Sequence, residues 1–234
     1  GAHGFMSEYF TSPAPYLIPV PEAYAEWGFL VEPISVSEKA LELAHASRSS
    51  FTWTPETALV LGNGPLGLVT VAMLVPDLDV YCLGRRDRPD PSIDLIEALG
   101  ATYVDGRETP VDAVASVHEP IDLVYEATGY AKHAVDCVDA LAPNGVAALL
   151  GVPASWEFSV DGGQFHRELV VTNKALVGSV NAGPSHFHAA VDRLASLPEW
   201  FFDDYVTEVA PVESFEAAFD PDATMKTAVE FGTR

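Results

Sequence analysis

The chain has 234 residues, 48% of them hydrophobic, and a formal net charge of −22. This length fits one large domain, or one domain and part of another, with a full hydrophobic core. The acidic balance argues against nucleic acid and anionic membrane surfaces as partners, and no apolar run approaches the ~20 residues of a membrane span.

The acidic residues are scattered along the chain rather than gathered in a tail, and lysine is scarce. Such a surface is typical of proteins adapted to high salt, where self-repulsion is screened, although an ordinary acidic cytosolic protein stays possible. Cys82 and Cys137 lie in apolar stretches, which favours two buried thiols in the reducing cytoplasm over a disulfide or a metal pair.

In chain order, residues 6–10 and 16–21 are expected to be short extended segments, residues 22–31 a short helix and residues 33–45 a longer one. From residue 57 onward, apolar strands alternate with helices, which predicts a parallel, doubly wound α/β sheet of six strands. The strands are expected at 57–62, 80–83, 102–104, 123–126, 146–150 and 175–180, and the helices near 66–75, 91–99, 131–141, 163–171 and 186–197. After residue 200 a strand at 206–209, a helix at 213–219 and a segment at 225–231 indicate a return to another structural unit.

The first of these strands is followed by a G-x-G-x-x-G motif. Gly62 allows the tight turn off the strand, Gly64 lets the backbone approach a pyrophosphate, and Gly67 lets the helix pack closely on the strand. The N-terminus of that helix offers free N–H groups to phosphates. The motif occurs by chance in loops, but between an apolar strand and an apolar helix it predicts a dinucleotide site of the Rossmann type.

Several motifs together resemble the zinc-dependent medium-chain dehydrogenases, most closely the haloarchaeal glucose dehydrogenases. They are the glycine loop Gly62-Asn63-Gly64-Pro65-Leu66-Gly67, the segment Cys82 to Pro89, Glu126-Ala127-Thr128-Gly129, Leu150-Gly151-Val152, Phe165 to Glu168 and Asn173 to Asn181. In that family about half of the chain precedes the nucleotide-binding strand, whereas about 55 residues precede it here. We therefore expect a C-terminal portion: residues 1–50 from a GroES-like catalytic domain, 51–200 the NADP-binding Rossmann domain, and 201–234 a return to the catalytic domain.

The resemblance implies an NADP-dependent oxidation of glucose or another aldose at C1 to a lactone, with zinc in the full-length parent. It implies that Glu32 is a zinc ligand and that His166 and Asn181 contact the sugar. Each has a plainer interpretation: Glu32 stabilised by a helix N-terminus, and the other two as structural residues. The implied cofactor contacts are the six residues of the glycine loop together with Gly84, Arg85, Arg86, Ala127, Thr128, Gly129, Leu150, Gly151, Val152, Ser179, Val180 and Asn181.

Arg85 and Arg86 follow the second strand, where a fold that prefers NAD usually carries an acidic residue on the ribose 2′-hydroxyl. Guanidinium groups suit a phosphate dianion, so the pair predicts NADP as cofactor with NAD secondary. Replacing Gly84 by Asp together with Arg85 by a neutral residue is expected to weaken NADP and spare NAD. The alternative is a basic turn that balances neighbouring acid.

The apolar last strand, residues 175–180, is expected at an uncovered sheet edge that pairs with its mate, as in the resembling family, giving a homodimer or homotetramer. Two rival functions stay open. One is a non-catalytic NADP-binding module, and the other is a zinc-independent quinone-type reductase on the same fold.

Overall fold

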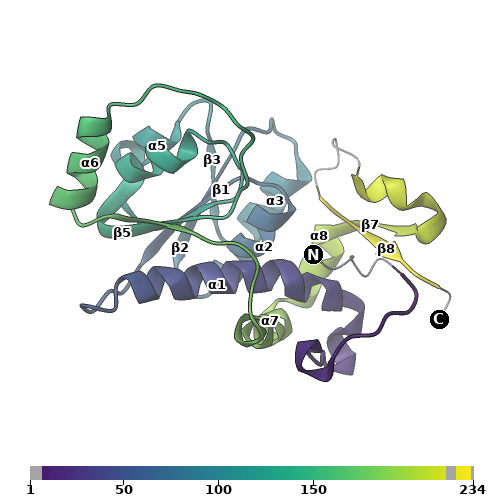
Figure 1. The fold of residues 1–234 in the computed structure, drawn as a ribbon. Helices are drawn as coiled ribbons and strands as arrows, with labels where there is room; N and C mark the ends of the chain where they lie inside the picture. Colours follow the sequence, from purple (N-terminus) through teal and green to yellow (C-terminus); the bar gives the residue numbers. More distant parts are fainter. Residues whose placement is uncertain (1–6, 220–224, 233–234) are drawn as a thin grey trace.

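The computed structural model describes residues 7–219 and 225–232 of the chain. Its centre is a six-stranded parallel sheet in the order β3-β2-β1-β4-β5-β6, with helices on both faces (Figure 1). The strands are β1 Thr57–Leu61, β2 Asp79–Gly84, β3 Thr102–Asp105, β4 Ile121–Glu126, β5 Leu141–Leu149 and β6 Ala175–Gly178. The principal helices are α1 Val31–Ser47, α2 Pro65–Leu74, α3 Pro91–Ala98, α4 Val114–Val117, α5 His133–Ala140, α6 Gly162–Val171 and α7 Pro184–Ser196. The predicted doubly wound α/β sheet is confirmed.

The strand order reverses at β1, which pairs with β2 on one side and with β4 on the other. In open parallel sheets, ligands bind outside the carboxyl ends of the strands at such a switch point. Backbone bonds extend the pairing beyond the strands, since Gly62 N–H donates to Leu83 O (2.8 Å) and Ala127 N–H donates to Leu61 O (3.1 Å). The glycine loop and the turn after β4 therefore start side by side.

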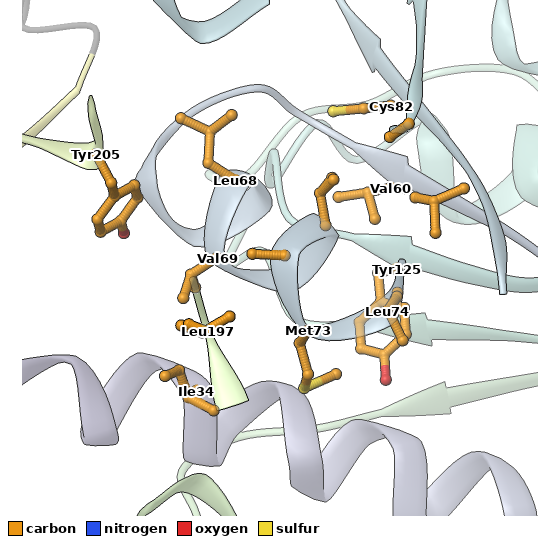
Figure 2. Packing of buried hydrophobic residues seen from close by; sticks show 14 of the residues in the cluster. Ile34, Val60, Leu68, Val69, Met73, Leu74, Cys82, Tyr125, Leu197 and Tyr205 are labelled. Atoms are coloured by element: carbon orange, nitrogen blue, oxygen red, sulfur yellow. The ribbon is translucent and has the colours of Figure 1, made fainter. Parts of the chain in front are cut away.

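Strand β1 is buried along its whole length because it contributes to both layers of the core. Ala58 and Val60 face the layer that contains α1, α2 and α7, while Leu59 and Leu61 face the layer that contains α5. Figure 2 shows part of the first layer, with Val60 on the sheet side of α2 and Ile34 of α1 on the other side of that helix. This alternation across a fully covered strand explains the continuous apolar run in the sequence.

Helix α2 is the central helix of that layer, and every residue from Gly67 to Leu74 is buried. Its polar Thr70 is satisfied internally, because the hydroxyl pairs with the Ser37 hydroxyl of α1 (2.7 Å) and donates to Leu66 O. The Tyr205 hydroxyl donates to Pro65 O (2.8 Å) at the first turn of α2. The start of α2, which directly follows the glycine loop, is thus anchored from a distant part of the chain.

The C-terminal part comprises α8 Glu199–Tyr205, β7 Val206–Pro211, the 3₁₀ segment η4 Val212–Phe219 and β8 Lys226–Glu230. Strands β7 and β8 form a separate two-stranded parallel sheet. This sheet lies at the opposite side of the molecule from α6 (Figure 1). The change of pattern after residue 200 is confirmed, whereas the division into domains at residues 50 and 200 stays a prediction.

The segments expected to be extended near the N-terminus join no strand where the structure describes them. Residues 7–13 and 17–21 form no strand, residues 14–16 form the short 3₁₀ helix η1, and residue 6 lies outside the described part. In the second segment, prolines 19 and 21 lack the N–H donors that a sheet ladder needs. The segment Glu22–Leu30 is the 3₁₀ helix η2 and leads directly into α1.

Both cysteines are free and buried, as predicted, and burial raises the pKa of the Cys82 thiol to about 12. Within residues 7–219 and 225–232, no helix is both long and apolar enough to cross a bilayer.

Candidate functional site

A cleft of about 710 Å³ lies at the carboxyl ends of β1 to β4. Its volume is within the range of cofactor sites. Its lining comes from the glycine loop, the end of β2, the segment after β3, the turn after β4 and the start of α5. It consists of Gly62, Asn63, Leu83, Gly84, Arg85, Gly106, Arg107, Pro110, Val111, Thr128, Tyr130, Lys132, His133 and Asp136.

The three glycines of the loop have the properties that the motif predicts. Gly62 has φ +108°, a conformation that L side chains rarely adopt. A Cβ on Gly67 would lie 1.8 Å from Gly62 O, so only glycine permits this contact between helix and strand, whereas Gly64 faces open space. Pro65 occupies the first turn of α2, whose leading N–H groups have no helical partner and are available to an anion.

Asn63 links the glycine loop to the start of α3. Its amide donates to the Ser92 hydroxyl (2.8 Å), and both residues are buried. Ser92 N–H in turn donates to the N-cap carboxylate of Asp90 (2.9 Å). The glycine loop and the N-terminus of α3 therefore share one hydrogen-bond network.

Gly84 ends β2 beneath this network and has no room for a side chain. A Cβ there would lie 2.5 Å from Asn63 Oδ1 and 2.9 Å from the Tyr103 ring. An acidic side chain at this position, as in folds that prefer NAD, would require Asn63 or Tyr103 to move. The effect of the double replacement expected from the sequence stays a prediction, and Asp at position 84 would act on Asn63 as well as on the ribose.

The two arginines after β2 differ in their surroundings. Arg85 is exposed, lines the cleft, and forms no hydrogen bond or ion pair with the described residues. Arg86 is partly buried, its guanidinium lies 3.7 Å from Asp90 Oδ2, and it is not among the lining residues. The predicted pair therefore divides into one guanidinium that is free in the cleft and one that is directed toward the N-cap of α3.

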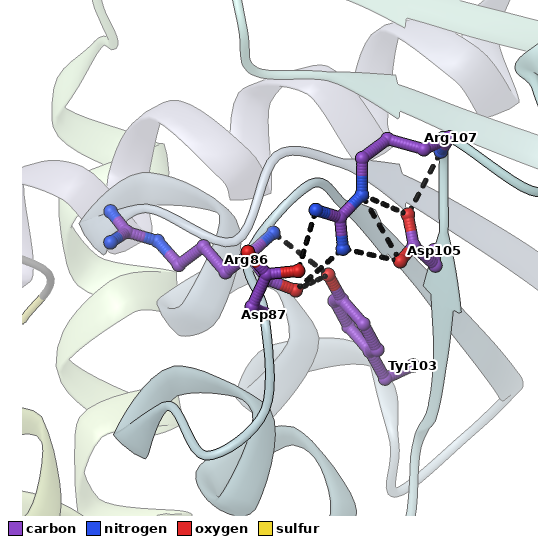
Figure 3. Close-up of polar contacts among 5 residues, drawn as sticks. All are labelled: Arg86, Asp87, Tyr103, Asp105 and Arg107. Atoms are coloured by element: carbon purple, nitrogen blue, oxygen red, sulfur yellow. Dashed lines mark hydrogen bonds and ion pairs between the residues drawn. The ribbon is translucent and has the colours of Figure 1, made fainter.

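A cluster at the ends of β2 and β3 surrounds the backbone of Arg86 (Figure 3). The Arg107 guanidinium contacts both oxygens of Asp105, with Nε–Oδ1 at 2.9 Å and NH2–Oδ2 at 2.6 Å, and contacts Asp87 through NH1 (2.6 Å). The hydrogen bond from Arg107 lowers the pKa of Asp105 to about 2. Tyr103 Oη accepts from Arg86 N–H and donates to Arg86 O, both at 3.1 Å.

The opposite end of the cleft is built on one buried carboxylate, Glu126, which is 4% exposed at the end of β4. It accepts from the N–H groups of Thr128 (2.8 Å) and Gly129 (3.0 Å) and from the Thr128 hydroxyl. His133 Nδ1 pairs with the same hydroxyl at 3.0 Å. Burial by itself would raise the pKa of Glu126, but the hydrogen bonds from His133 and Thr128 outweigh it and the pKa lies below its ordinary value.

The ends of β4 and β5 approach backbone to backbone at this point. Leu150 and Gly151 N–H both donate to Glu126 O at 2.9 Å. A Cβ on Gly151 would lie 2.1 Å from Gly129 N and 2.6 Å from Glu126 Oε2, and Gly129 itself has φ +69°. Glycine at positions 129 and 151 therefore allows the close contact between the ends of β4 and β5, in addition to forming turns.

Other predicted residues do not line the cleft. His166 is exposed on α6, and Asn181, with φ +56°, follows β6, where Lys39 Nζ donates to Val180 O (2.8 Å). Their roles as sugar contacts stay predictions, as do all the predicted cofactor contacts, whether or not the residue lines the cleft. The predicted cofactor contacts outside the lining are Gly64, Pro65, Leu66, Gly67, Arg86, Ala127, Gly129, Leu150, Gly151, Val152, Ser179, Val180 and Asn181.

Glu32, the predicted zinc ligand, is exposed in the first turn of α1. Within the described part of the chain, no three His, Cys, Asp or Glu side chains are grouped so that they could hold a metal ion. Zinc needs three or four converging ligands, so these residues do not by themselves form a zinc site.

Several residues that line the cleft were not predicted from the sequence, among them Arg107, Tyr130, Lys132 and His133. Arg107 follows β3 and the other three follow the turn after β4. Their position just beyond the carboxyl ends of parallel strands was the available signal.

Comparison with known proteins shows extended similarity. A family model described as "Glucose dehydrogenase C-terminus" matches residues 25–231. Glucose 1-dehydrogenase of Haloferax mediterranei is 62% identical over 238 residues, covering 100% of this chain and 67% of that protein. The corresponding protein of Halobacterium salinarum is 59% identical over 239 residues, with the same shares. The chain thus spans about two thirds of the length of these relatives.

Solved structures show the same similarity. Haloferax mediterranei glucose dehydrogenase in complex with NADP, Zn and gluconolactone superposes with a TM-score of 0.96 at 62% identity, covering 100% of this chain and 67% of that chain. The 2R,3R-butanediol dehydrogenase of Bacillus subtilis, at 21% identity, a TM-score of 0.72 and coverage of 91% and 60%, shows the fold alone. The family match and the level of identity place the chain in the glucose dehydrogenase C-terminal family of the medium-chain dehydrogenases.

Proposed function

We propose that this chain forms the NADP-binding region of a glucose 1-dehydrogenase, in which C1 of the sugar is oxidised to the lactone and NAD is a secondary cofactor. The similarity to the Haloferax enzyme, whose structure contains NADP and gluconolactone, supports the substrate and the cofactor. Bound NADP would supply the hydride acceptor.

The observation that carries the choice of NADP is the unpaired guanidinium of Arg85 in the cleft. In this proposal the N-terminus of α2 and the open backbone at Gly64 bind the pyrophosphate, and Arg85 binds the 2′-phosphate. The turn held by Glu126 shapes the wall beside the nicotinamide. His166 and Asn181 contact the sugar, and Glu32 is a candidate zinc ligand that needs partners beyond the described residues.

The test is titration calorimetry of NADP and NAD against the wild type and Arg85→Gln at one fixed salt concentration. Loss of a charge-assisted contact of roughly 1.5–3 kcal/mol should weaken NADP at least about tenfold and leave NAD within about twofold. Arg88→Gln is the matched control, since Arg88 carries the same charge three positions away but pairs with Glu97 at the surface. Equal losses for both cofactors would mean that Arg85 does not recognise the phosphate.

The purified 234-residue chain is expected to bind NADP without oxidising glucose, because its described residues gather no group of metal ligands. An assay with NADP, glucose and added zinc checks this directly. Zinc-dependent turnover by this chain would contradict the expectation. Reduction of a quinone without zinc would favour a quinone-type reductase, and NADP binding without turnover in a longer form of the protein would favour a non-catalytic module.

The dimer prediction also has structural support. Strand β6 lies at the edge of the sheet, and Val170, Val171 and Val180 beside it are each about two thirds exposed. Pairing of β6 with its mate across a twofold axis gives a homodimer, and two such dimers give a homotetramer. Light scattering in high salt tests this, and a monomer would reject it for this chain. The cytoplasm is the proposed location, on the basis of the two reduced cysteines.

A further inference from the structure

We propose that Tyr103 and Arg107 are positioning residues for NADP selectivity: they hold the backbone of Arg86 and the carboxylate of Asp87 against the end of β3, so that Arg85 stays unpaired in the cleft. This inference rests on the proposed NADP-binding function. It adds two residues that come from a different strand than the predicted arginine pair and that need no contact with the 2′-phosphate.

The first part of the arrangement is a contact from Tyr103 to both backbone polar groups of one residue. Tyr103 lies in β3, and its hydroxyl bonds Arg86 N–H and Arg86 O at 3.1 Å each. The segment after β2 is exposed at Arg85, Asp87 and Arg88, so these two bonds tie a surface loop to the sheet. They fix the direction in which the chain leaves β2.

The second part is Arg107, whose three guanidinium nitrogens are all engaged. Nε and NH2 contact Asp105, NH1 contacts Asp87, and NH2 also donates to Arg86 O at 3.4 Å. One positive charge thus faces two carboxylates, so the cluster offers no net attraction to a phosphate. The planar fork of arginine suits this bridge, since it can bind two acceptors in different directions.

The consequence for Arg85 follows from Asp87, which is only two residues away. The Asp87 side chain is 84% exposed and, without Arg107, would be free to turn toward Arg85. A carboxylate beside Arg85 would both pair with it and repel a phosphate dianion. By holding Asp87 at the β3 side, Arg107 keeps the one unpaired guanidinium of this loop available to the 2′-phosphate.

The experiment measures the dissociation constants of NADP and NAD by titration calorimetry for Arg107→Gln, Arg107→Lys and Tyr103→Phe. Arg107→Gln should weaken NADP about tenfold and Tyr103→Phe about threefold or more, both with less than about twofold change for NAD. Arg107→Lys keeps the charge but lacks the fork, so NADP binding should stay weakened. Lys226→Gln, which removes one charge from β8, outside this cluster, should leave the ratio of the two constants unchanged.

Four outcomes would overturn the inference. Full recovery by Arg107→Lys would mean that charge alone matters, and a normal ratio in Tyr103→Phe would mean that the loop needs no fixation. Equal losses of NAD and NADP with a lowered Tm would mean that the cluster only supports the fold. A wild-type chain without preference for NADP would instead reject the proposed function, whereas normal preference with unaffected variants would reject only this inference.

Discussion

The two ends of the cleft are built on opposite physical principles. At the β2–β3 end, charged side chains at the surface form ion pairs, with Arg107, Asp105 and Asp87 all accessible to solvent. At the β4–β5 end, the carboxylate of Glu126 is buried and satisfied mainly by backbone N–H groups and a hydroxyl. Exposed pairs contribute little to stability, whereas a buried charge becomes costly once its partners are lost. We infer that the first end provides selectivity and the second provides rigidity.

The largest effect is expected from Glu126→Gln. The amide keeps one acceptor oxygen but places an NH₂ group among donors, which leaves buried polar groups unsatisfied at about 1–3 kcal/mol. The Tm should fall by several degrees, and NADP and NAD should weaken together because the turn after β4 loosens. Differential scanning calorimetry and cofactor titration measure both effects.

Asp122→Asn is the matched control for that substitution. Asp122 lies on the same strand and also accepts from backbone and hydroxyl donors, those of Glu56 and Thr57, but at the amino end of the sheet. It should leave cofactor binding unchanged. If Asp122→Asn weakened the cofactors as much as Glu126→Gln did, the rigidity of the β4–β5 end would not be local.

Two glycine substitutions should distinguish an effect on packing, measured as stability, from an effect on cofactor binding. Gly84→Ala places a methyl group against Asn63 and Tyr103 and should lower stability by roughly 1–3 kcal/mol. Gly64→Ala has open space and should leave the Tm unchanged while weakening both cofactors, since the methyl group meets the pyrophosphate. An unchanged Tm in Gly84→Ala would show that Asn63 moves without cost.

Salt should raise the stability of the whole molecule but weaken NADP binding at the β2–β3 end of the cleft. The net charge of −22 makes self-repulsion large, so the Tm should rise as potassium chloride is increased to molar concentration. NADP should weaken several-fold more than NAD over the same range, because the contact between Arg85 and the phosphate is screened. A Tm that falls steadily with salt, or parallel curves for the two cofactors, would count against these assignments.

The smallest expected effect is the dependence of stability on acidic pH. Because folding lowers the pKa of Glu126, its ionised form stabilises the fold above about pH 4.3, the ordinary value for Glu, and this contribution is lost as the pH falls through the lower folded-state pKa. The Tm difference between wild type and Glu126→Gln should therefore be constant near neutral pH and narrow below about pH 4. A difference independent of pH down to pH 3 would show that ionisation of Glu126 does not stabilise the turn.

The sequence analysis predicted the parts of the fold and site that depend on local patterns. The apolar strand of residues 57–61, the glycine loop and Pro65 at the helix start follow from neighbouring residues, and the structure has them as expected. Before residue 22 the described residues form no strand, and in residues 16–21 the prolines remove the donors that a sheet ladder needs.

The features that were not predicted from the sequence depend on contacts between strand ends that are far apart in the chain. Arg107 meets Asp87 across 20 positions, and the carboxamide of Asn63 occupies the space beside Gly84 across 21. Neither contact leaves a periodic pattern in the chain. The same holds for Arg85 and Arg86, which look equivalent in sequence and differ only because Asp90, at the N-cap of α3, lies near one of them.

A crystal structure of the chain with NADP bound would show directly which arginine binds the 2′-phosphate. We expect the 2′-phosphate in hydrogen-bond contact with the Arg85 guanidinium, while Arg107 keeps its contacts with Asp105 and Asp87 and Glu126 keeps its contact with Gly129 N–H. A 2′-phosphate bound by Arg107, with Asp87 released and Arg85 turned to solvent, would contradict the division between a residue that recognises the phosphate and residues that position it.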